Sequence, residues 1–199
     1  MLTLNRRPMT HLRWIGASLL FLFANASVSQ ADEEKVIPRP AIGERAVDFE
    51  LPIVGQKSFL TLSDEYKEGP VVVIVLRGYP GYQCPLCNRQ VSSLANRARV
   101  LGEEAHKVIL VYPGETSGLD RRAEQFMGSR RLPEPLVIVR DDGMKMVKEW
   151  GLRWDAINET AYPATFVVDQ NGRIAWKKVS DSHAGRSTTE EILKELRKL

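Results

Sequence analysis

The chain has 199 residues, of which 43% are hydrophobic and 27% are charged. These values are typical of a soluble globular protein with one hydrophobic core. The formal net charge is +3, and three of the basic residues lie within the first 31 positions. Beyond position 31, acidic and basic residues balance at 25 each. The composition therefore argues against a nucleic-acid-binding protein, and no long apolar segment predicts a membrane span.

The first 31 residues have the three-part pattern of a secretory signal peptide. The basic head contains Arg6, Arg7 and Arg13. An apolar run of 11 residues follows, from Trp14 to Ala24, whereas a bilayer span needs about 20. The small residue Ala31 then precedes an abrupt polar start. We expect cleavage after Ala31, export to the periplasm or beyond, and no stable membrane span after cleavage; an uncleaved anchor is the alternative.

Residues 32–45 are polar and proline-containing, which predicts a loose N-terminal arm in front of a domain at 46–199. The domain opens with a possible short strand at 46–51 and a helical turn at 61–64. An unbroken β-branched run from Val71 to Leu76 is typical of a central strand buried on both faces. Glycine and proline break this run, and an apolar stripe at helical spacing then predicts a helix over 85–101.

The second half of the chain continues to alternate strand and helix patterns. We expect strands at 108–112 and 136–139, and helices at 119–127 and 144–150. Two further strands, at 165–168 and 174–178, are joined by a turn sequence at 169–172 that is typical of a hairpin. An amphipathic helix at 188–199 closes the chain. This order predicts an α/β domain with a central mixed sheet flanked by helices.

The two cysteines of the chain, Cys84 and Cys87, lie three residues apart where the central strand gives way to a helix. Pro85 suits the first helical position because its missing N–H is not needed there. The helix dipole favours a thiolate at this end, so we expect Cys84 to be exposed and nucleophilic. Cys87, one turn further on, would be more buried and would resolve a mixed disulfide.

Two other uses of the cysteine pair are weaker. A zinc site would need two more ligands, and beyond residue 31 only His106 and His183 are available, in no paired spacing. An inert pair is disfavoured because a dithiol between a strand and a helix is the redox pattern. We therefore expect no metal and no cofactor other than the disulfide itself.

Four stretches of the sequence resemble the alkyl hydroperoxide reductase/thiol-specific antioxidant (AhpC/TSA, or redoxin) family of the thioredoxin superfamily, which includes the peroxiredoxins. They are Gly43–Phe49, Val71–Cys87, Thr165–Gly172 and Gly185–Ser187. The similarity covers about residues 40–199. It implies a thioredoxin-like fold and thiol-based redox chemistry.

The sequence departs from the peroxiredoxin pattern Pro-x-x-x-Thr/Ser-x-x-Cys at two points. Pro80 and Cys87 are kept, but Cys84 stands where peroxiredoxins have the hydroxyl residue. Pro163 stands where they have an arginine. The resemblance thus implies that two groups that hold and polarise peroxide are missing. In thioredoxin-like proteins a proline at this position is cis and faces the dithiol, so we expect the same of Pro163; a simple strand-start proline is the alternative.

The leading functional interpretation is an exported thiol–disulfide oxidoreductase in which Cys84 attacks, Cys87 resolves and Pro163 docks the partner. The alternative is a thiol-dependent peroxidase with Cys87 peroxidatic and Cys84 resolving. A binding module with a permanently oxidised pair is a third, non-enzymatic reading. The expected partners are thiols or disulfides, proteins or small molecules, with hydroperoxides under the alternative, together with a reducing partner protein and no nucleic acid.

Overall fold

The computed structural model describes residues 2–3 and 37–199. The predicted signal peptide therefore lies, apart from Leu2 and Thr3, outside the described residues. Within the described ranges, no helix is both long enough and apolar enough to cross a bilayer.

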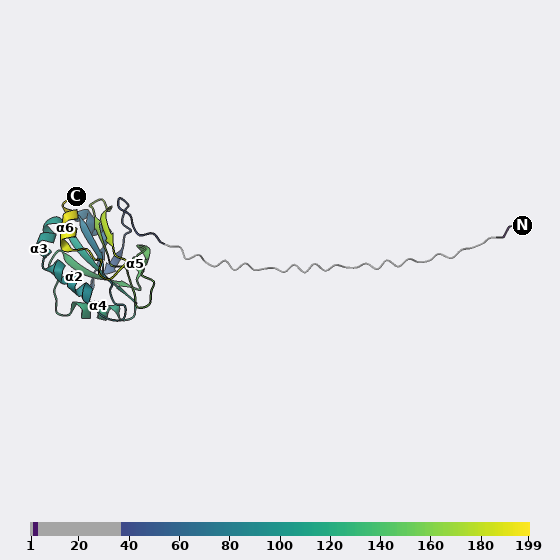
Figure 1. The fold of residues 1–199 in the computed structure, drawn as a ribbon, viewed down its shortest axis with the longest axis horizontal. Helices are drawn as coiled ribbons and strands as arrows, with labels where there is room; N and C mark the ends of the chain where they lie inside the picture. The colour runs from purple at the N-terminus through teal and green to yellow at the C-terminus, as the bar shows by residue number, and fades with distance from the viewer. Residues whose placement is uncertain (1, 4–36) are drawn as a thin grey trace. The chain divides into compact units, whose positions relative to one another are not determined.

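A five-stranded mixed sheet in the order β5-β4-β3-β6-β7 forms the centre of the domain (Figure 1). Its strands are β3 (Val71–Val75), β4 (Lys107–Gly114), β5 (Leu136–Asp142), β6 (Ala164–Val168) and β7 (Ile174–Val179). Strands β3, β4 and β5 run parallel, whereas β6 is antiparallel to both β3 and β7. All five residues of β3 are buried, because helices cover both faces of the sheet. The predictions of a mixed α/β sheet and of a central strand starting at Val71 are confirmed.

Four helices cover the face of the sheet that carries the cysteines. They are α2 (Pro85–Ala95), α3 (Ala98–Glu104), α4 (Leu119–Met127) and α6 (Thr189–Leu196). Their buried side chains pack with alternate residues of β3, among them Val72 and Ile74, and with Cys84 and Cys87. The dithiol is therefore part of a hydrophobic core rather than a surface feature.

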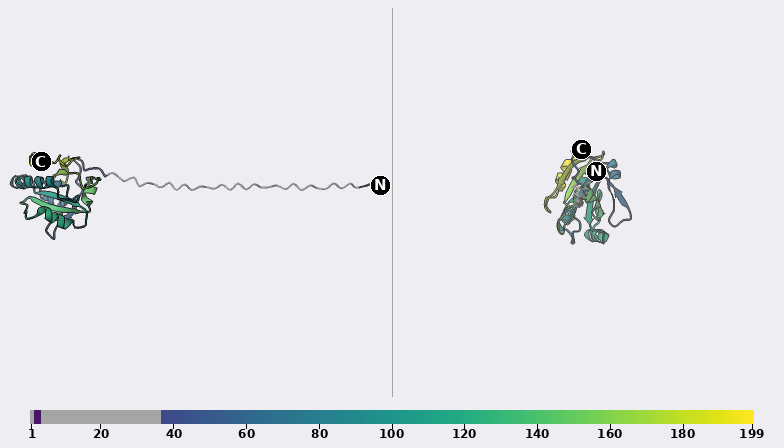
Figure 2. Two further views of the ribbon diagram at one scale, coloured as in Figure 1. Left: turned by 60° about the horizontal axis from the view of Figure 1, so that its bottom comes forward. Right: turned by 90° about the vertical axis from the view of Figure 1, so that its right-hand side faces the viewer.

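The opposite face is covered by α1 (Leu62–Glu68), α5 (Lys145–Glu149) and a hairpin of β1 (Glu50–Pro52) and β2 (Phe59–Thr61). Trp150 is fully buried there, and its ring packs edge-on against Phe166 at 4.9 Å between centroids. In Figure 1, α2, α3 and α6 lie on one side of the strands and α5 on the other, and the two further views in Figure 2 allow the same layers to be followed.

Two of the expected elements differ in the structure, and one strand was not expected. The helix predicted over 85–101 is two helices, because Asn96 and Arg97 make a turn in which the Arg97 N–H bonds to the Leu94 carbonyl. This turn lets Leu101 of α3 reach the same core as Leu94 of α2. The first strand begins at Glu50 rather than at residue 46, and β2 has no counterpart among the predictions.

The described part of the predicted N-terminal arm lies against the β6–β7 turn and strand β7. Gly43 N–H donates to the Ile174 carbonyl at 2.8 Å, and Ala46 N–H donates to the Gly172 carbonyl at 2.8 Å. Lys177 also donates from Nζ to the Pro40 carbonyl at 2.6 Å. Residues 40–46 thus extend the antiparallel side of the sheet by backbone and side-chain hydrogen bonds.

Candidate active site

The loop that leads from β3 to the dithiol depends on a glycine. Gly78 has a φ of +68°, and a Cβ atom at this position would overlap the carbonyl oxygen of Pro113. Only glycine tolerates both the left-handed backbone and the close approach. The loop thereby turns along the end of β4, where Tyr79 N–H donates to the Pro113 carbonyl at 3.0 Å, and delivers Cys84 to the start of α2.

Cys84 is the N-cap of α2, and its sulfur accepts the backbone N–H of Cys87 at 3.2 Å. Pro85 occupies the first turn as expected. Both cysteines are free thiols. Cys84 is 2% exposed and Cys87 is fully buried. The expectation that Cys84 is exposed is therefore wrong: its side chain packs into the core below α2, and a guanidinium group lies over the sulfurs.

The surroundings of the two sulfurs shift their pKa values in opposite directions. The thiol of Cys87 donates to the Cys84 sulfur, and this bond, together with the Cys87 N–H and the charge of Arg186, outweighs burial and lowers the pKa of Cys84 to about 6. Donation to Cys84 and burial raise the pKa of Cys87 above its ordinary range. Ionisation therefore favours Cys84 over Cys87, and the thiolate rather than the thiol is the reactive form of a cysteine.

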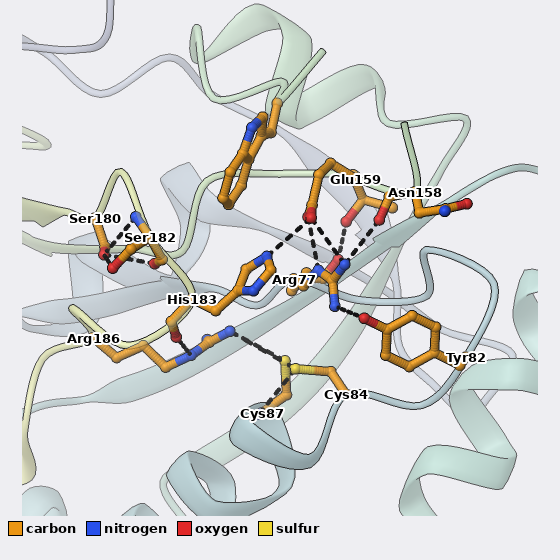
Figure 3. Close-up of polar contacts among 12 residues, drawn as sticks. Arg77, Tyr82, Cys84, Cys87, Asn158, Glu159, Ser180, Ser182, His183 and Arg186 are labelled. Carbon is orange, nitrogen blue, oxygen red and sulfur yellow. Dashed lines mark hydrogen bonds and ion pairs between the residues drawn. The ribbon is translucent and has the colours of Figure 1, made fainter. Parts of the chain in front are cut away.

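Arg186 places its guanidinium beside both sulfurs (Figure 3). Its Nη2 atom lies 3.5 Å from the Cys87 sulfur and 3.9 Å from the Cys84 sulfur. The other two nitrogens are held in place: Nε donates to the His183 carbonyl at 3.1 Å, and Nη1 donates to Gln90 Oε1 of α2 at 2.9 Å. A fixed guanidinium can stabilise negative charge on sulfur and on a bound oxygen.

A second set of polar side chains lies beyond the sulfurs and centres on Glu159 (Figure 3). The buried guanidinium of Arg77, at the end of β3, donates to both Glu159 oxygens at 2.7 and 3.0 Å. It also donates to the Tyr82 hydroxyl. His183 Nε2 lies 2.9 Å from Glu159 Oε1. Burial opposes the charge of Glu159, but the bonds from Arg77 and His183 outweigh it and lower the pKa of the carboxyl.

Comparison with known proteins agrees with this fold. Residues 41–194 match the model of the family described as Redoxin. The chain belongs to the redoxin family. The predicted resemblance is thus confirmed, and the CxxC pair makes the protein a thiol-based redox member of the family.

Individual redoxin relatives are more distant. Over 110 residues the chain is 28% identical to chloroplastic peroxiredoxin Q of Gentiana triflora, a match that spans 55% of this chain and 46% of that protein. Among solved structures, peroxidoxin BcpB of Mycobacterium tuberculosis matches with a TM-score of 0.62 at 22% identity over 81% of this chain and 99% of that one. A peroxiredoxin-like protein from Aquifex aeolicus matches with a TM-score of 0.64 at 16% identity over 82% of this chain and 90% of that one. These structures show that the fold is thioredoxin-like, as predicted.

The expectation of a cis bond before Pro163 is wrong. Within residues 37–199 the cis peptide is the one between Glu134 and Pro135. Pro163 directly precedes β6, and its carbonyl accepts the N–H of Ser180 at 2.9 Å, which continues the β6–β7 ladder. This is the geometry of a proline at the start of a strand. The docking role of Pro163 stays a prediction.

Sequence reasoning missed Arg186 as a site residue of this redoxin. Because Pro163 stands where peroxiredoxins have an arginine, the sequence analysis expected no guanidinium at the sulfurs. Arg186 supplies one from the loop between β7 and α6. The Gly185–Ser187 stretch, which contains Arg186, could have pointed to this residue, but the sequence analysis used it only to support the family resemblance. Arg77, Glu159 and His183 gave no signal, since no spacing connects them along the chain.

Proposed function

We propose that the protein is a thiol-dependent peroxidase that ends each turnover with a Cys84–Cys87 disulfide. The observation that carries this proposal is the contact of the Arg186 guanidinium with both sulfurs. Peroxiredoxins have an arginine where this chain has Pro163, and Arg186 supplies a cationic group from a different position in the sequence. Relatives and structural neighbours named peroxiredoxin or peroxidoxin support the same activity.

The proposed chemistry begins with attack by the Cys84 thiolate on one oxygen of a hydroperoxide. The S–O bond forms as the O–O bond breaks, and the departing alkoxide or hydroxide takes a proton to leave as an alcohol or as water. Cys84 is then a sulfenic acid. The Cys87 sulfur attacks it, the disulfide forms, and the hydroxyl group leaves with the Cys87 proton as water. A thiol reductant, for which we propose a partner protein, returns two electrons and two protons.

This assignment of the two cysteines rests on the thiolate. The pKa of Cys84 is lowered to about 6 and that of Cys87 is raised, so only Cys84 is ionised near neutral pH. The position of Cys87 in the peroxiredoxin-like pattern favours the reverse assignment, in which Cys87 attacks and Cys84 resolves. The two assignments predict different behaviour of the single variants.

The test is stoichiometric peroxide consumption by the reduced protein without any reductant. The wild type should consume peroxide and gain the internal disulfide. Cys87→Ser should still react and accumulate a sulfenic acid that a dimedone-type reagent traps on Cys84, whereas Cys84→Ser should lose the fast reaction. Trapping on Cys87 in Cys84→Ser would establish the reverse roles. Consumption no faster than that of a free thiol at the same pH would rule out the peroxidase.

A thiol–disulfide oxidoreductase is the second candidate, and one observation favours it. The N-cap position of Cys84 and its backbone hydrogen bond stabilise a thiolate that would attack a disulfide as readily as a peroxide. In that case the reduced protein would exchange with a disulfide substrate at a useful rate while peroxide consumption stayed at the free-thiol level. Mixed disulfides would accumulate in Cys87→Ser and not in Cys84→Ser.

We also propose that residues 1–31 direct export. The support is the basic head followed by an 11-residue apolar run and Ala31. Expression of the full chain in a Gram-negative host should deliver a mature protein to the periplasm, with Asp32 as its first residue on N-terminal sequencing. A chain that stays in the cytoplasm with Met1 intact would contradict this proposal.

A further inference from the structure

Glu159 joins three segments that surround the dithiol. Its side chain is 10% exposed and lies in the loop between α5 and β6. One oxygen accepts Arg77 Nε at 2.7 Å, and the other lies within hydrogen-bond distance of both Arg77 Nη2 and His183 Nε2, at 3.0 and 2.9 Å. A single carboxylate is thus shared by the end of β3 and by the loop between β7 and α6.

The connection through Arg77 reaches the Cys87 side of the dithiol. The backbone of Arg77 acts on the Cys87 thiol and opposes the rise of its pKa, although the Cys84 bond and burial outweigh it. Its guanidinium also donates to the Asn158 carbonyl at 2.8 Å, and its own carbonyl accepts the hydroxyl of Thr160. Residues 158–160 are therefore fastened to the strand end that faces Cys87.

The connection through His183 reaches the cation over both sulfurs. The His183 carbonyl accepts Nε of Arg186 at 3.1 Å, and the ring packs against Trp154 at 5.0 Å between centroids. The hydrogen bond between the His183 imidazole and Glu159 also restrains the backbone of His183. That backbone orients the guanidinium, whose one side-chain partner besides the sulfurs, among residues 37–199, is Gln90.

We propose that Glu159 is a positioning residue that, through His183, holds Arg186 against the two sulfurs. Glu159 itself has no hydrogen bond to either sulfur in the described part of the chain. Its effect is to keep the guanidinium oriented, since an Arg side chain otherwise has several rotatable bonds and loses little by turning to water. The proposal rests on the proposed function only in treating the dithiol as the reacting group.

The direction of the effect separates this role from plain electrostatics. Glu159→Gln removes a negative charge near the thiolate, and by charge alone this change would lower the pKa of Cys84. Loss of a positioned guanidinium would instead raise it. The proposal therefore predicts a shift opposite to the one that the deleted charge gives.

The experiment titrates the reduced proteins by thiolate absorbance and by the alkylation rate of Cys84 against pH. In Glu159→Gln we expect the midpoint to rise from about 6 by about half a unit to one unit, so that alkylation at pH 6 slows about two- to fivefold. An unchanged or lowered midpoint in a folded Glu159→Gln would overturn the proposal.

His183 provides a matched pair of variants that differ in one hydrogen bond. His183→Ala and His183→Gln both remove the imidazole, but the Gln amide can still donate to Glu159. We expect His183→Ala to raise the midpoint and His183→Gln to restore most of the wild-type value. Equal shifts in the two variants would show that the bond to Glu159 is not the cause. His183 is 40% exposed, so these variants decide the matter even where Glu159→Gln does not fold.

The control is a second Glu–His pair on the same protein. His106 Nε2 lies 3.1 Å from Glu65 Oε2, with side-chain exposures of 33% and 22%, and within residues 37–199 neither side chain is hydrogen-bonded to a residue of the site. His106→Ala and Glu65→Gln should leave the thiol titration unchanged; a shift as large as that of Glu159→Gln would overturn the proposal. The titration needs no peroxide, so a wild type without peroxidase activity would defeat the proposed function and leave this test standing.

Discussion

The Nη2 atom of Arg186 lies 3.5 Å from the sulfur of Cys87, although 99 positions separate the two residues. The same nitrogen reaches the Cys84 sulfur at 3.9 Å. One guanidinium thus faces both members of the dithiol, and its other nitrogens are bonded to protein acceptors. This arrangement explains how a redoxin with proline at position 163 keeps a cation at its sulfurs.

Replacing Arg186 should weaken the thiolate. We expect Arg186→Met to raise the pKa of Cys84 by about one unit, because a nearby positive charge favours the ionised thiol. In Arg186→Lys the pKa of Cys84 should lie between those of the wild type and Arg186→Met, since an ammonium keeps the charge but not the planar fork. Alkylation rate against pH measures the shift. Arg99→Met is the control, because that exposed arginine pairs with Glu103 on its own helix, α3; an equal shift there would show a general charge effect.

The stability of the reduced protein should depend on pH between about 6 and 9. The folded pKa of Cys84 is about 6 against an ordinary value of 9.0, so between these values the unfolded chain keeps a proton that the native chain has released. The free energy of unfolding should therefore rise with pH, by up to about 1.4 kcal/mol per unit. This contribution is complete above the ordinary value and is lost as the pH falls through about 6.

Denaturant unfolding of the reduced and oxidised forms at several pH values measures this dependence. The oxidised form has no thiol to titrate and provides the control, as does Cys84→Ser. Above pH 9 the raised pKa of Cys87 adds a slope of opposite sign, because the unfolded chain then releases a proton that the native Cys87 retains. Parallel profiles for the reduced and oxidised forms between pH 6 and 9 would contradict the lowered pKa.

Gly78→Ala should destabilise the fold more than an alanine at another left-handed glycine. At Gly78 the added Cβ overlaps the Pro113 carbonyl, whereas at Gly118, with a φ of +69°, it meets nothing within 4 Å. We expect a loss above about 2 kcal/mol at Gly78 and of about 1 kcal/mol at Gly118. Urea unfolding compares the two variants, and equal losses would show that the loop moves freely away from β4.

Thr188→Ala should cost stability without changing the thiols. Thr188 and Glu191 form a capping box at the start of α6, in which the threonine hydroxyl accepts the Glu191 N–H at 3.1 Å. Removing this hydroxyl should cost about 1 kcal/mol in the free energy of unfolding. The pKa of Cys84 should remain near 6, since Arg186 keeps its bonds to His183 and Gln90. A shifted thiol titration would mean that the start of α6 itself positions the guanidinium.

The sequence alone determined the sheet, the dithiol and the family. Val71–Leu76 could be recognised as a buried strand because β-branched residues without polar interruption suit a strand covered on both faces. The cysteine pair could be placed at the start of a helix because Pro85 and the three-residue spacing are local features. Such features need no knowledge of distant contacts. The break in the predicted helix at Asn96 is also local, but helical spacing of apolar residues continues through it and hides it.

Only the tertiary structure decided which groups surround the sulfurs. Arg186 and Glu159 lie in loops without periodicity, and their approach to the dithiol depends on how the β6–β7 hairpin and the loop before β6 pack beside β3. The burial of Cys84, which the sequence analysis expected to be exposed, has the same origin. Hydrogen bonds between such segments act over a few ångströms in space and leave no regular spacing along the chain, so the sequence could locate the cysteine pair but not the charged groups that surround it.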